Sequence, residues 1–563
     1  MLLRMDAGSE VFQIQNDAHR SPSWWRSAVF YEVYIRSFQD SNGDGIGDLR
    51  GIEQRLPYLK QLGVDVLWIT PFYPSPMADF GYDVSDYRGV DPSFGSMEDF
   101  DHLLQSAHAL DIRIVIDMVL NHTSDEHAWF AESRSSRTNP KRDWYIWRDA
   151  KPDGSPPNNW TTFFGGSAWT WDEQTGQYYL HLFLDRQPDL NWRNPEVVQA
   201  IDSVLRFWLD KGVDGFRLDA INFLIKHEAF PDMPVVTQAT GGDLVQYHIY
   251  VNNQPELHPV LQNVRRVLDS YPGERVLIGE TGTLKAPELS QFYGADLDEI
   301  HLPMIVLPLH TPWQANAMRE CLVHFYQGIP QGASPHFVFS NHDDKRLITR
   351  YGHEHHRSIA MLLLTLLGSP ILYYGDEIAM CDAVIPLEKR VDTAGLIDPD
   401  HYPGRDPNRT PMQWDASAHA GFTPDNVEPW LPIHENHNAI NVMVQDRDPG
   451  STLNFYRTLL ELRRSSPALR EGSFQLLEDD SGDIVAYLRE CDGERLLIMI
   501  NFGGDPHVLD LSALADQAHC VLSSTMQRPE AVSVAEVTLN AYESVLFRLA
   551  SNNKEVERQA HVK

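Results

Sequence analysis

The stretch MEDFDHLLQSAHALDIRIVIDMVL, residues 97–120, joins a helix pattern to a strand pattern and indicates the fold class. Apolar residues at helical spacing predict a helix over Met97–Ala109, and the β-branched run Arg113–Leu120 predicts a buried strand. The same unit recurs, with helices predicted over Pro195–Lys211 and Leu257–Tyr271. Eight strands in this alternation predict an α/β protein with a closed parallel (β/α)8 barrel. The predicted strands are Ala28–Ile35, Val64–Pro71, Arg113–Leu120, Gly215–Ala220, Arg275–Thr281, Glu299–Met304, His336–Asp343 and Ser369–Asp376.

Two gaps between these strands are too long for simple loops. Residues 122–191 are rich in Trp, Gly, Asn and Tyr and predict an inserted domain, and a second long segment spans residues 378–442. After a helix over Leu453–Arg464, strands without helices between them predict a C-terminal antiparallel β-sandwich. The expected layout is a loose tail 1–22, a barrel from 23–121 and 192–465, an inserted domain 122–191, a β-sandwich 466–550 and a tail 551–563. The expected sandwich strands are Ile484–Arg489, Arg495–Asn501 and Val537–Ala550.

The composition narrows the class of ligand. The 563 residues carry a formal net charge of −33, which disfavours nucleic acid and anionic membranes and suits a neutral ligand such as a sugar. Four scattered cysteines predict neither a zinc site nor a disulfide framework. The first residues show no apolar signal-peptide core, so we expect a cytoplasmic protein. No pattern indicates an organic cofactor or an oligomeric state.

Polar residues follow the ends of the predicted strands, where barrel enzymes carry their active sites. Strand three gives Asp117 and His122, strand four Arg217 and Asp219, strand five Glu280, and strand seven His342 and Asp343. Each carboxylate taken singly fits a structural ion pair equally well. Together, the carboxylates Asp219, Glu280 and Asp343, two histidines and an arginine at one barrel mouth would be costly to bury without a function. We therefore predict a catalytic cluster.

Cleavage of a glycosidic bond needs such a set, because one carboxyl must protonate the leaving oxygen while an ionised one meets the charge at the anomeric carbon. The two-residue period of a strand places Arg217 beside Asp219, where we expect it to lower the pKa of that carboxyl. A second carboxylate near Glu280, with Asp343 as the candidate, is expected to raise the pKa of Glu280 towards an acid role.

Several segments carry a family likeness. In chain order AVFYEVYIRSFQDSNGDGIGDLRGI, DFGYDVSDY, DMVLNHTS, QPDLNW, GFRLDA, IGET, SNHDDKR and RTPMQW resemble the α-amylase superfamily (glycoside hydrolase family 13), nearest to its α-glucosidase and oligo-1,6-glucosidase group. The resemblance implies that Asp219 is the nucleophile, Glu280 the general acid/base and Asp343 the acid that stabilises the distorted sugar. In a retaining site the first two carboxyls lie about 5–5.5 Å apart.

The resemblance also implies substrate contacts. Asp79 and Arg409 match the pair that closes the non-reducing end, which implies removal of single glucose units. Tyr82 matches the ring that stacks on the reacting sugar. For Phe164, plain core packing is the alternative to an aromatic wall. The remaining matches are His122, Arg217 and His342 as hydroxyl and nucleophile contacts, and Phe164 and Phe183 as aromatic walls from the inserted domain.

The loop Asp40–Asp48 resembles a calcium loop. Oxygen ligands are expected from Asp40, Asn42, Asp44 and Asp48 and from the Ile46 carbonyl, with Gly45 at the turn. The loop departs from an EF-hand at Gly51, which stands where a bidentate Glu is usual. The family implies structural Ca²⁺, or Mg²⁺, and the alternative is a turn that binds metal only at high concentration.

The leading prediction is therefore an exo-acting, retaining α-glucosidase that acts on a small oligosaccharide or disaccharide. A transglucosidase, or an isomerase similar to trehalose synthase, is the alternative, because a sugar can intercept the same intermediate. A non-catalytic barrel relative is disfavoured, since all three carboxylates are present. Ala220, directly after Asp219, favours α-1,4 over α-1,6 linkages within the group.

Overall fold

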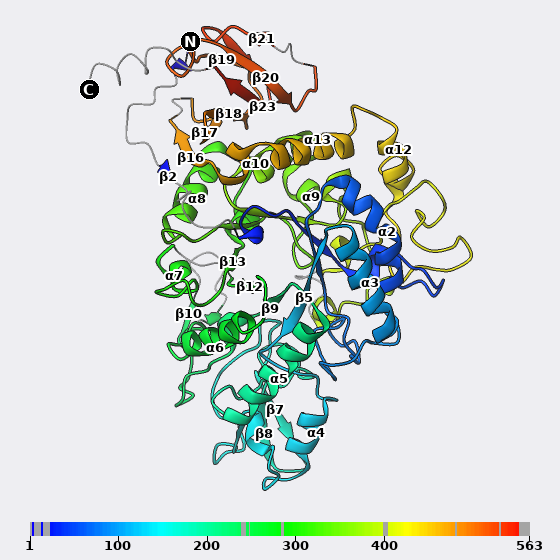
Figure 1. Ribbon diagram of the computed structural model, residues 1–563. Coiled ribbons are helices and arrows are strands. Elements are labelled where there is room, and N and C mark those ends of the chain that lie inside the picture. Colours follow the sequence, from blue (N-terminus) through cyan, green and yellow to red (C-terminus); the bar gives the residue numbers. More distant parts are fainter. Residues whose placement is uncertain are drawn as a thin grey trace.

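The computed structural model describes residues 3–4, 13–14, 23–237, 244–246, 248–282, 286–397, 404–478, 481–527 and 531–550. Its centre is a closed barrel of eight parallel strands in the order β12-β13-β14-β15-β3-β4-β5-β9 (Figure 1). Register is regular, as where Ile116 pairs with Phe216 and Ile69. The barrel strands are β3 (Phe30–Val33), β4 (Val66–Ile69), β5 (Arg113–Val119), β9 (Gly215–Asp219), β12 (Val276–Glu280), β13 (Leu302–Ile305), β14 (His336–Val338) and β15 (Ser369–Tyr373).

The predicted barrel is thus confirmed, although every strand differs in its bounds, most of them by one to three residues at an end. The end of β14 and the start of β13 are two of the larger differences. β14 ends at Val338 rather than at Asp343, because the Asn341 side chain accepts hydrogen bonds from the Asp343 and Asp344 N–H groups and turns the chain. β13 begins at Leu302, since the N–H of Ile300 bonds to the preceding loop at the Phe292 carbonyl.

The outer helices follow their sequence signals. α3 (Met97–Ala109) begins with a capping box between Ser96 and Asp99. α5 (Pro195–Lys211) is capped by Asn194 and ends at Gly212, whose φ of 103° suits glycine. The other helices are α1 (Ile35–Phe38), α2 (Leu49–Leu62), α6 (Leu257–Asp269), α7 (Ala286–Gln291), α8 (Ala315–Gln327), α9 (Leu347–Tyr351), α10 (His356–Thr365), α11 (Thr393–Ile397), α12 (Val442–Asp446), α13 (Thr452–Ser465) and α14 (Pro467–Glu471). No helix in the described ranges is long and apolar enough to cross a membrane.

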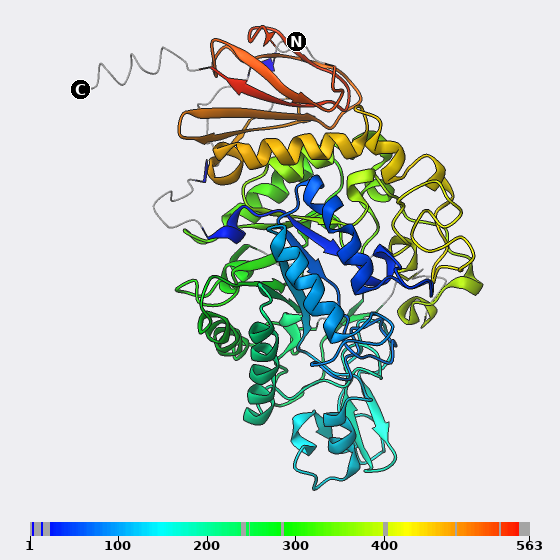
Figure 2. The same ribbon diagram turned by 45° about the vertical axis from the view of Figure 1, so that its right-hand side comes forward.

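The segment after β5 forms a small unit at one end of the molecule (Figures 1 and 2). It holds α4 (Ala128–Ser135) and a three-stranded sheet in the order β6-β8-β7, from β6 (Trp147–Arg148), β7 (Trp169–Asp172) and β8 (Gln177–Leu180). A buried ion pair between Asp189 and Lys226, 2.7 Å, ties this unit to the loop after β9. The connection positions its aromatic residues over the barrel mouth. A separate hairpin joins β10 (Val235–Thr237) and β11 (Leu244–Gln246).

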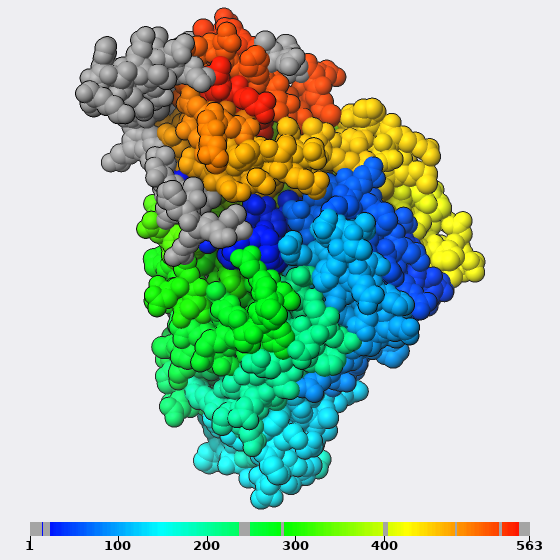
Figure 3. All heavy atoms as spheres, viewed as in Figure 1, coloured from blue at the N-terminus to red at the C-terminus, as the bar shows by residue number. Residues whose placement is uncertain are grey.

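The C-terminal strands lie at the opposite end of the molecule, beyond α13 (Figures 2 and 3). They form a seven-stranded sheet, order β2-β16-β17-β18-β23-β20-β21, and a three-stranded sheet, order β1-β19-β22, with an apolar core that includes Leu497 and Leu509. The predicted single strand Val537–Ala550 is wrong, because a turn with Tyr542 at φ 57° splits it into β22 and β23. The strands are β16 (Ser473–Leu477), β17 (Ile484–Cys491), β18 (Glu494–Asn501), β19 (His507–Asp510), β20 (Ala518–Ser523), β21 (Ala531–Val532), β22 (Val537–Leu539) and β23 (Ser544–Leu549).

Two short N-terminal strands complete these sheets. β1 (Leu3–Arg4) pairs with β19, and β2 (Gln13–Ile14) pairs with β16. These residues depart from the expected loose tail 1–22, because unpaired edges of the C-terminal sheets bind them. The remaining residues of that tail, and the predicted tail 551–563, lie outside the described residues.

Candidate active site

The three candidate catalytic carboxylates meet at one mouth of the barrel. β9 ends at Asp219, β12 ends at Glu280, and Asp343 follows β14. All three line a cavity of about 190 Å³, smaller than the roughly 300–1,000 Å³ of pockets for drug-sized ligands. The other lining residues are Asp79, Tyr82, His122, Phe163, Phe164, Phe183, Ala220, Asn222, Phe223, Gly282, His342 and Arg405.

One guanidinium organises the first group of carboxylates. Arg217 Nη1 lies 2.7 Å from Asp219 Oδ1 and 3.0 Å from Asp117 Oδ1, and its Nη2 lies 2.7 Å from Glu280 Oε2. The Ala220 N–H also donates to Glu280 Oε2, at 3.1 Å. We call Arg217, Asp117, Asp219 and Glu280 the Arg217 cluster. It orients the predicted nucleophile and the predicted acid through a single rigid fork.

The charge balance of this cluster sets the net pKa shift of Asp219. Burial raises the pKa of Asp219 well above its usual value, and Glu280 and Asp117 add to that rise against the opposing effect of Arg217. Burial likewise raises the pKa of Asp117 to about 6, although Arg217 opposes it. Arg217 therefore lowers the pKa of Asp219, as expected, but burial and the neighbouring carboxyls outweigh it, because three carboxylates share one guanidinium.

Asp343 lies in different surroundings. Arg409 Nη2 donates to its Oδ1 at 2.8 Å, Arg405 Nη1 reaches the same oxygen at 3.3 Å, and His342 Nε2 lies 3.3 Å from Oδ2. Burial alone would raise the pKa of Asp343, but His342, Arg409 and Arg405 outweigh it and hold the pKa well below the usual range. Asp343 thus contacts cations, and it is Asp117 and Asp219 that share a partner with Glu280.

The partner of Asp79 is also corrected. Arg405 Nη2 lies 2.6 Å from Asp79 Oδ1, whereas Arg409 is fully buried behind Asp343 and bonds to the His342 carbonyl at 2.8 Å. Asp392 holds Arg405 in place, with Nη2 to Oδ1 at 2.7 Å and Nε to Oδ2 at 3.1 Å. The predicted pair of Asp79 and Arg409 is therefore replaced by Asp79 and Arg405. We call Arg405, Arg409, Asp79, Asp343 and Asp392 the Arg405 cluster.

His122 and Tyr82 lie between the two clusters. Gln187 links His122 to Asp79, because its Nε2 lies 3.0 Å from His122 Nε2 and 3.0 Å from Asp79 Oδ2. Burial lowers the pKa of His122 to about 3, so this imidazole is neutral and can exchange hydrogen bonds with sugar hydroxyls. The Tyr82 hydroxyl donates to Asp117 Oδ2 at 3.0 Å, and its ring stacks on His342 with 5.3 Å between centroids.

Aromatic residues from the inserted segment form one wall of the cavity. Phe183 packs on His122 at 5.0 Å, and Arg405 lies over the Phe164 ring at 5.7 Å. Phe164 therefore belongs to the cavity wall, and core packing does not describe it. The sequence prediction missed Phe163, which is 40% exposed and packs on Phe223 at 4.5 Å. An exposed Phe beside a polar cavity is suited to an apolar sugar face.

The predicted calcium loop is tied by its own hydrogen bonds. Asp40 accepts from the N–H groups of Asn42, Gly43 and Gly45, at 3.0, 2.7 and 2.8 Å. Asp48 caps α2 by accepting from the Gly51 N–H at 2.7 Å. Asp44 accepts from the Ile46 N–H at 2.8 Å. No three His, Cys, Asp or Glu side chains within the described ranges form a group that could hold a metal. Both oxygens of Asp40 and Oδ1 of Asp48 accept two hydrogen bonds each. Both oxygens of Asp44 and Oδ2 of Asp48 accept one and keep a second lone pair, so calcium binding stays a prediction.

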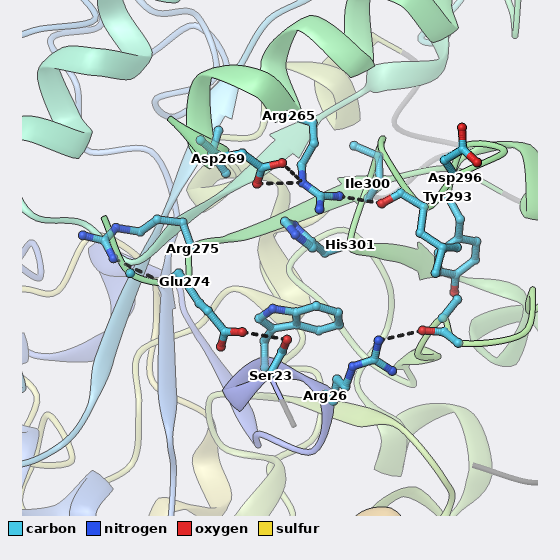
Figure 4. Close-up of a pocket in the computed structure, with 16 residues that line it drawn as sticks. Ser23, Arg26, Arg265, Asp269, Glu274, Arg275, Tyr293, Asp296, Ile300 and His301 are labelled. Carbon is cyan, nitrogen blue, oxygen red and sulfur yellow. Dashed lines mark hydrogen bonds and ion pairs between the residues drawn. The ribbon is translucent and has the colours of Figure 1, made fainter. Parts of the chain in front are cut away.

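A second cavity, of about 470 Å³, lies at the other face of the barrel (Figure 4). It is lined by residues that directly precede barrel strands, such as Arg275 before β12 and His301 before β13. Two of its acidic side chains are engaged, since Asp269 binds Arg265 and Glu274 accepts from Ser23. This face of such barrels contributes to stability, and catalysis occurs at the opposite mouth.

Comparisons with known proteins agree with this geometry. The alpha-amylase catalytic domain matches residues 32–472, and the maltogenic amylase C-terminal domain matches residues 474–546. The chain is 44% identical over 506 residues to a probable alpha-glucosidase of Rhizobium meliloti (strain 1021), covering 87% of this chain and 91% of that one. It is 40% identical over 517 residues to an oligo-1,6-glucosidase of Heyndrickxia coagulans, covering 85% and 92%.

Two solved structures also match this chain over most of its length. The crystal structure of an alpha-glucosyl transfer enzyme matches with a TM-score of 0.87 and 41% identity, covering 94% of this chain and all (100%) of that one. The trehalulose synthase of Pseudomonas mesoacidophila MX-45 matches with a TM-score of 0.86 and 35% identity, again covering 94% and 100%. The chain is therefore an enzyme of the α-amylase family, glycoside hydrolase family 13, with a catalytic barrel and a maltogenic-amylase-type C-terminal domain.

Proposed function

We propose that this enzyme is a retaining, exo-acting α-glucosidase. The single observation that supports it most is the shared guanidinium of Arg217, which holds Asp219 and Glu280 on adjacent strands at 2.7 Å each. The Asp219 carboxylate attacks the anomeric carbon while Glu280 protonates the leaving oxygen, which forms a covalent β-glucosyl ester. Glu280 then takes a proton from water, and that water displaces Asp219 with net retention.

The proton that Glu280 must donate is available in the Arg217 cluster. Three carboxyls share one guanidinium, and the raised pKa values of Asp219 and Asp117 favour one proton shared within the cluster. The reaction requires this proton on Glu280, so that Asp219 attacks in its ionised form. Asp343 stays ionised beside its arginines and suits the partial positive charge of the sugar in the transition state.

Removal of single glucose units is supported by the closed end of the cavity. The ion pair of Asp79 and Arg405 lies there, and both side chains are mostly buried. Such charged groups bind the terminal hydroxyls of one sugar and leave no path for a longer chain beyond it. We keep α-1,4 linkages as the preferred substrates, on the identity of Ala220 alone.

Transglucosylation is the second candidate. The similarity to an alpha-glucosyl transfer enzyme and to a trehalulose synthase favours it specifically. The exposed ring of Phe163 at the cavity mouth supports it, because an aromatic face can hold an acceptor sugar in place of water. We also propose a reducing, cytoplasmic compartment, supported by the four cysteines, whose scattered positions do not form a disulfide framework.

Product analysis tests both candidates. The enzyme is incubated with maltose, isomaltose, nigerose, kojibiose, trehalose and sucrose, and early products are followed by proton NMR and chromatography. The exo-glucosidase proposal expects α-glucose first. In a separate incubation with maltotriose, it expects maltose plus glucose. Initial β-glucose would exclude retention. Trehalose or longer oligosaccharides from maltose would favour the transfer reaction.

A further inference from the structure

A buried carboxyl, Glu32, lies beneath the active site without an assigned role. It is the one charged residue of the barrel strand β3 and is fully buried. Its Oε1 lies 2.6 Å from His342 Nδ1, and its Oε2 has no hydrogen-bond partner among the described residues. A carboxylate with one bare oxygen in such a place would be costly, so its protonation state needs an explanation.

The ring of His342 is held in one orientation. It stacks between Tyr82 and Tyr34, with centroids at 5.3 and 5.9 Å, and Trp68 meets it edge-on at 6.0 Å. Its Nε2 lies 3.3 Å from Asp343 Oδ2. Each ring nitrogen therefore lies against a carboxyl oxygen, and each contact needs one proton to be attractive.

We propose that Glu32 is a positioning residue that stays protonated and donates to His342 Nδ1, so that the neutral imidazole keeps its proton on Nε2. The Nε2–H group then donates to Asp343 and holds that carboxylate towards the sugar site. The inference rests on the proposed function only for its kinetic consequence, because the proton position is a property of the resting protein.

The electrostatic surroundings support a proton on Glu32. Burial raises its pKa well above the usual value, and Asp343, Asp117 and Asp376 add to the rise against Arg217. Tyr373 on β15 also faces it. Burial lowers the pKa of His342 well below its usual value, so the proton of the Glu32–His342 contact belongs to the carboxyl.

The arrangement has a pH limit. When Glu32 ionises at alkaline pH, His342 must place its proton on Nδ1 to satisfy the new carboxylate. Its Nε2 lone pair then faces the Asp343 carboxylate, and the two acceptors repel. We expect kcat/KM to fall on the alkaline side for this reason.

Three variants test the proposal. Glu32→Gln can still donate to Nδ1 but cannot ionise, so it should retain kcat/KM within about threefold and extend activity to higher pH. Glu32→Leu cannot donate and should lose kcat/KM by about 10²-fold, as for a positioning group. The matched control is Glu377→Gln, a buried carboxyl that accepts from Tyr31 and Tyr58 and does not touch His342. Glu377→Gln should show the same dependence of kcat/KM on pH as the parent.

Infrared difference spectroscopy supplies a readout that needs no substrate. The parent should show the C=O band of a protonated, buried carboxylic acid that Glu32→Gln removes and Glu377→Gln does not. Absence of a band assignable to Glu32 would overturn the proposal even if the enzyme proves to be an α-glucosidase. Equal loss of activity in Glu32→Gln and Glu32→Leu, or a shifted acid limb in Glu32→Gln, would also overturn it, since both indicate an ionised Glu32.

Discussion

The Arg217 cluster and the Arg405 cluster both combine arginines with carboxylates, but in different ratios. Arg217 serves three carboxylates, whereas Arg405 and Arg409 together serve Asp79, Asp343 and Asp392. The pKa of Asp219 is raised in the first cluster, and the pKa of Asp343 is lowered in the second, although desolvation acts to raise both. Counting cations against carboxylates decides the sign, because desolvation acts alike in both places.

Because of this difference, the two clusters suit different chemical roles in the active site. The Arg217 cluster retains a proton and can lend it, which is what a general acid requires. The Arg405 cluster stays ionised and can bind hydroxyls and a positively charged transition state. Variants that change the ratio of cations to carboxylates in only one cluster therefore test these two roles directly.

Loss of the nucleophile should have the largest effect. Asp219→Asn keeps the shape of the Arg217 cluster but removes the attacking carboxylate, so kcat should fall by at least about 10⁴-fold. Steady-state kinetics measure the loss, and circular dichroism checks the fold. Asp202→Asn is the matched control, since Asp202 on α5 only accepts from Asn263 at 2.9 Å. Undiminished turnover in Asp219→Asn would refute its role.

Double-mutant cycles should confirm which arginine serves Asp79. Arg405→Ala should lower kcat/KM by about 30-fold to several thousand-fold, the cost of truncating one partner of a buried charge pair (roughly 2–5 kcal/mol). Asp79→Ala combined with Arg405→Ala should show a coupling of about 0.5–3 kcal/mol. Asp79→Ala combined with Arg409→Ala should be nearly additive. A larger coupling to Arg409 would restore the pair expected from the sequence.

The two clusters should also depend on pH with opposite signs. Asp117 has a folded-state pKa of about 6 against an ordinary value of 3.8, so its protonated form favours folding. That stability is full below pH 3.8 and is lost as the pH rises through 6. Asp117→Asn should therefore gain stability relative to the parent on going from pH 4 to 7, by up to about 3 kcal/mol at 1.4 kcal/mol per unit.

Asp392, in the Arg405 cluster, should show the opposite dependence of stability on pH. Its pKa is about 2, lowered by Arg405 against the effect of burial, so its stability is full above 3.8 and is lost as the pH falls through 2. Asp392→Asn should be destabilised at pH 7, with a difference that narrows as the pH falls. Thermal unfolding of both variants and the parent from about pH 2 to pH 7 covers the two pKa windows and measures the slopes. Slopes of the same sign would contradict the charge-counting argument.

The sequence predicted the barrel because apolar strands and amphipathic helices are local patterns. Asp219 and Glu280 were identified for the same reason, since each ends such a strand. Glu32 was missed, although a single charge within the apolar run AVFYEVYI was a usable signal. A charged residue on the inward face of a barrel strand requires a buried partner.

The contacts of the long loops could not be predicted in this way. Arg405 and Arg409 are only four residues apart, and which one reaches Asp79 depends on Asp392, thirteen residues before Arg405. The net shift of the pKa of Asp219 was not predictable for a related reason, because Asp117 on β5 and Glu280 on β12 reach the same guanidinium. Both outcomes depend on how many charges meet, which is set by tertiary structure.

The loop Asp40–Asp48 extends the comparison to carboxylates without a guanidinium. Backbone N–H groups satisfy Asp40, Asp44 and Asp48 in place of cations. Burial raises the pKa of Asp48, so a bound cation would supply the missing charge.

If the loop binds Ca²⁺, millimolar Ca²⁺ at 100 times its Kd would stabilise the protein by about 2.7 kcal/mol, and a chelator would reverse the gain. Differential scanning fluorimetry with and without chelator measures the shift. Asp44→Ala should lose the response, whereas Asp149→Ala, which removes an exposed partner of Arg137, should keep it. An equal response in both variants would place the cation elsewhere and leave this loop held by its own hydrogen bonds.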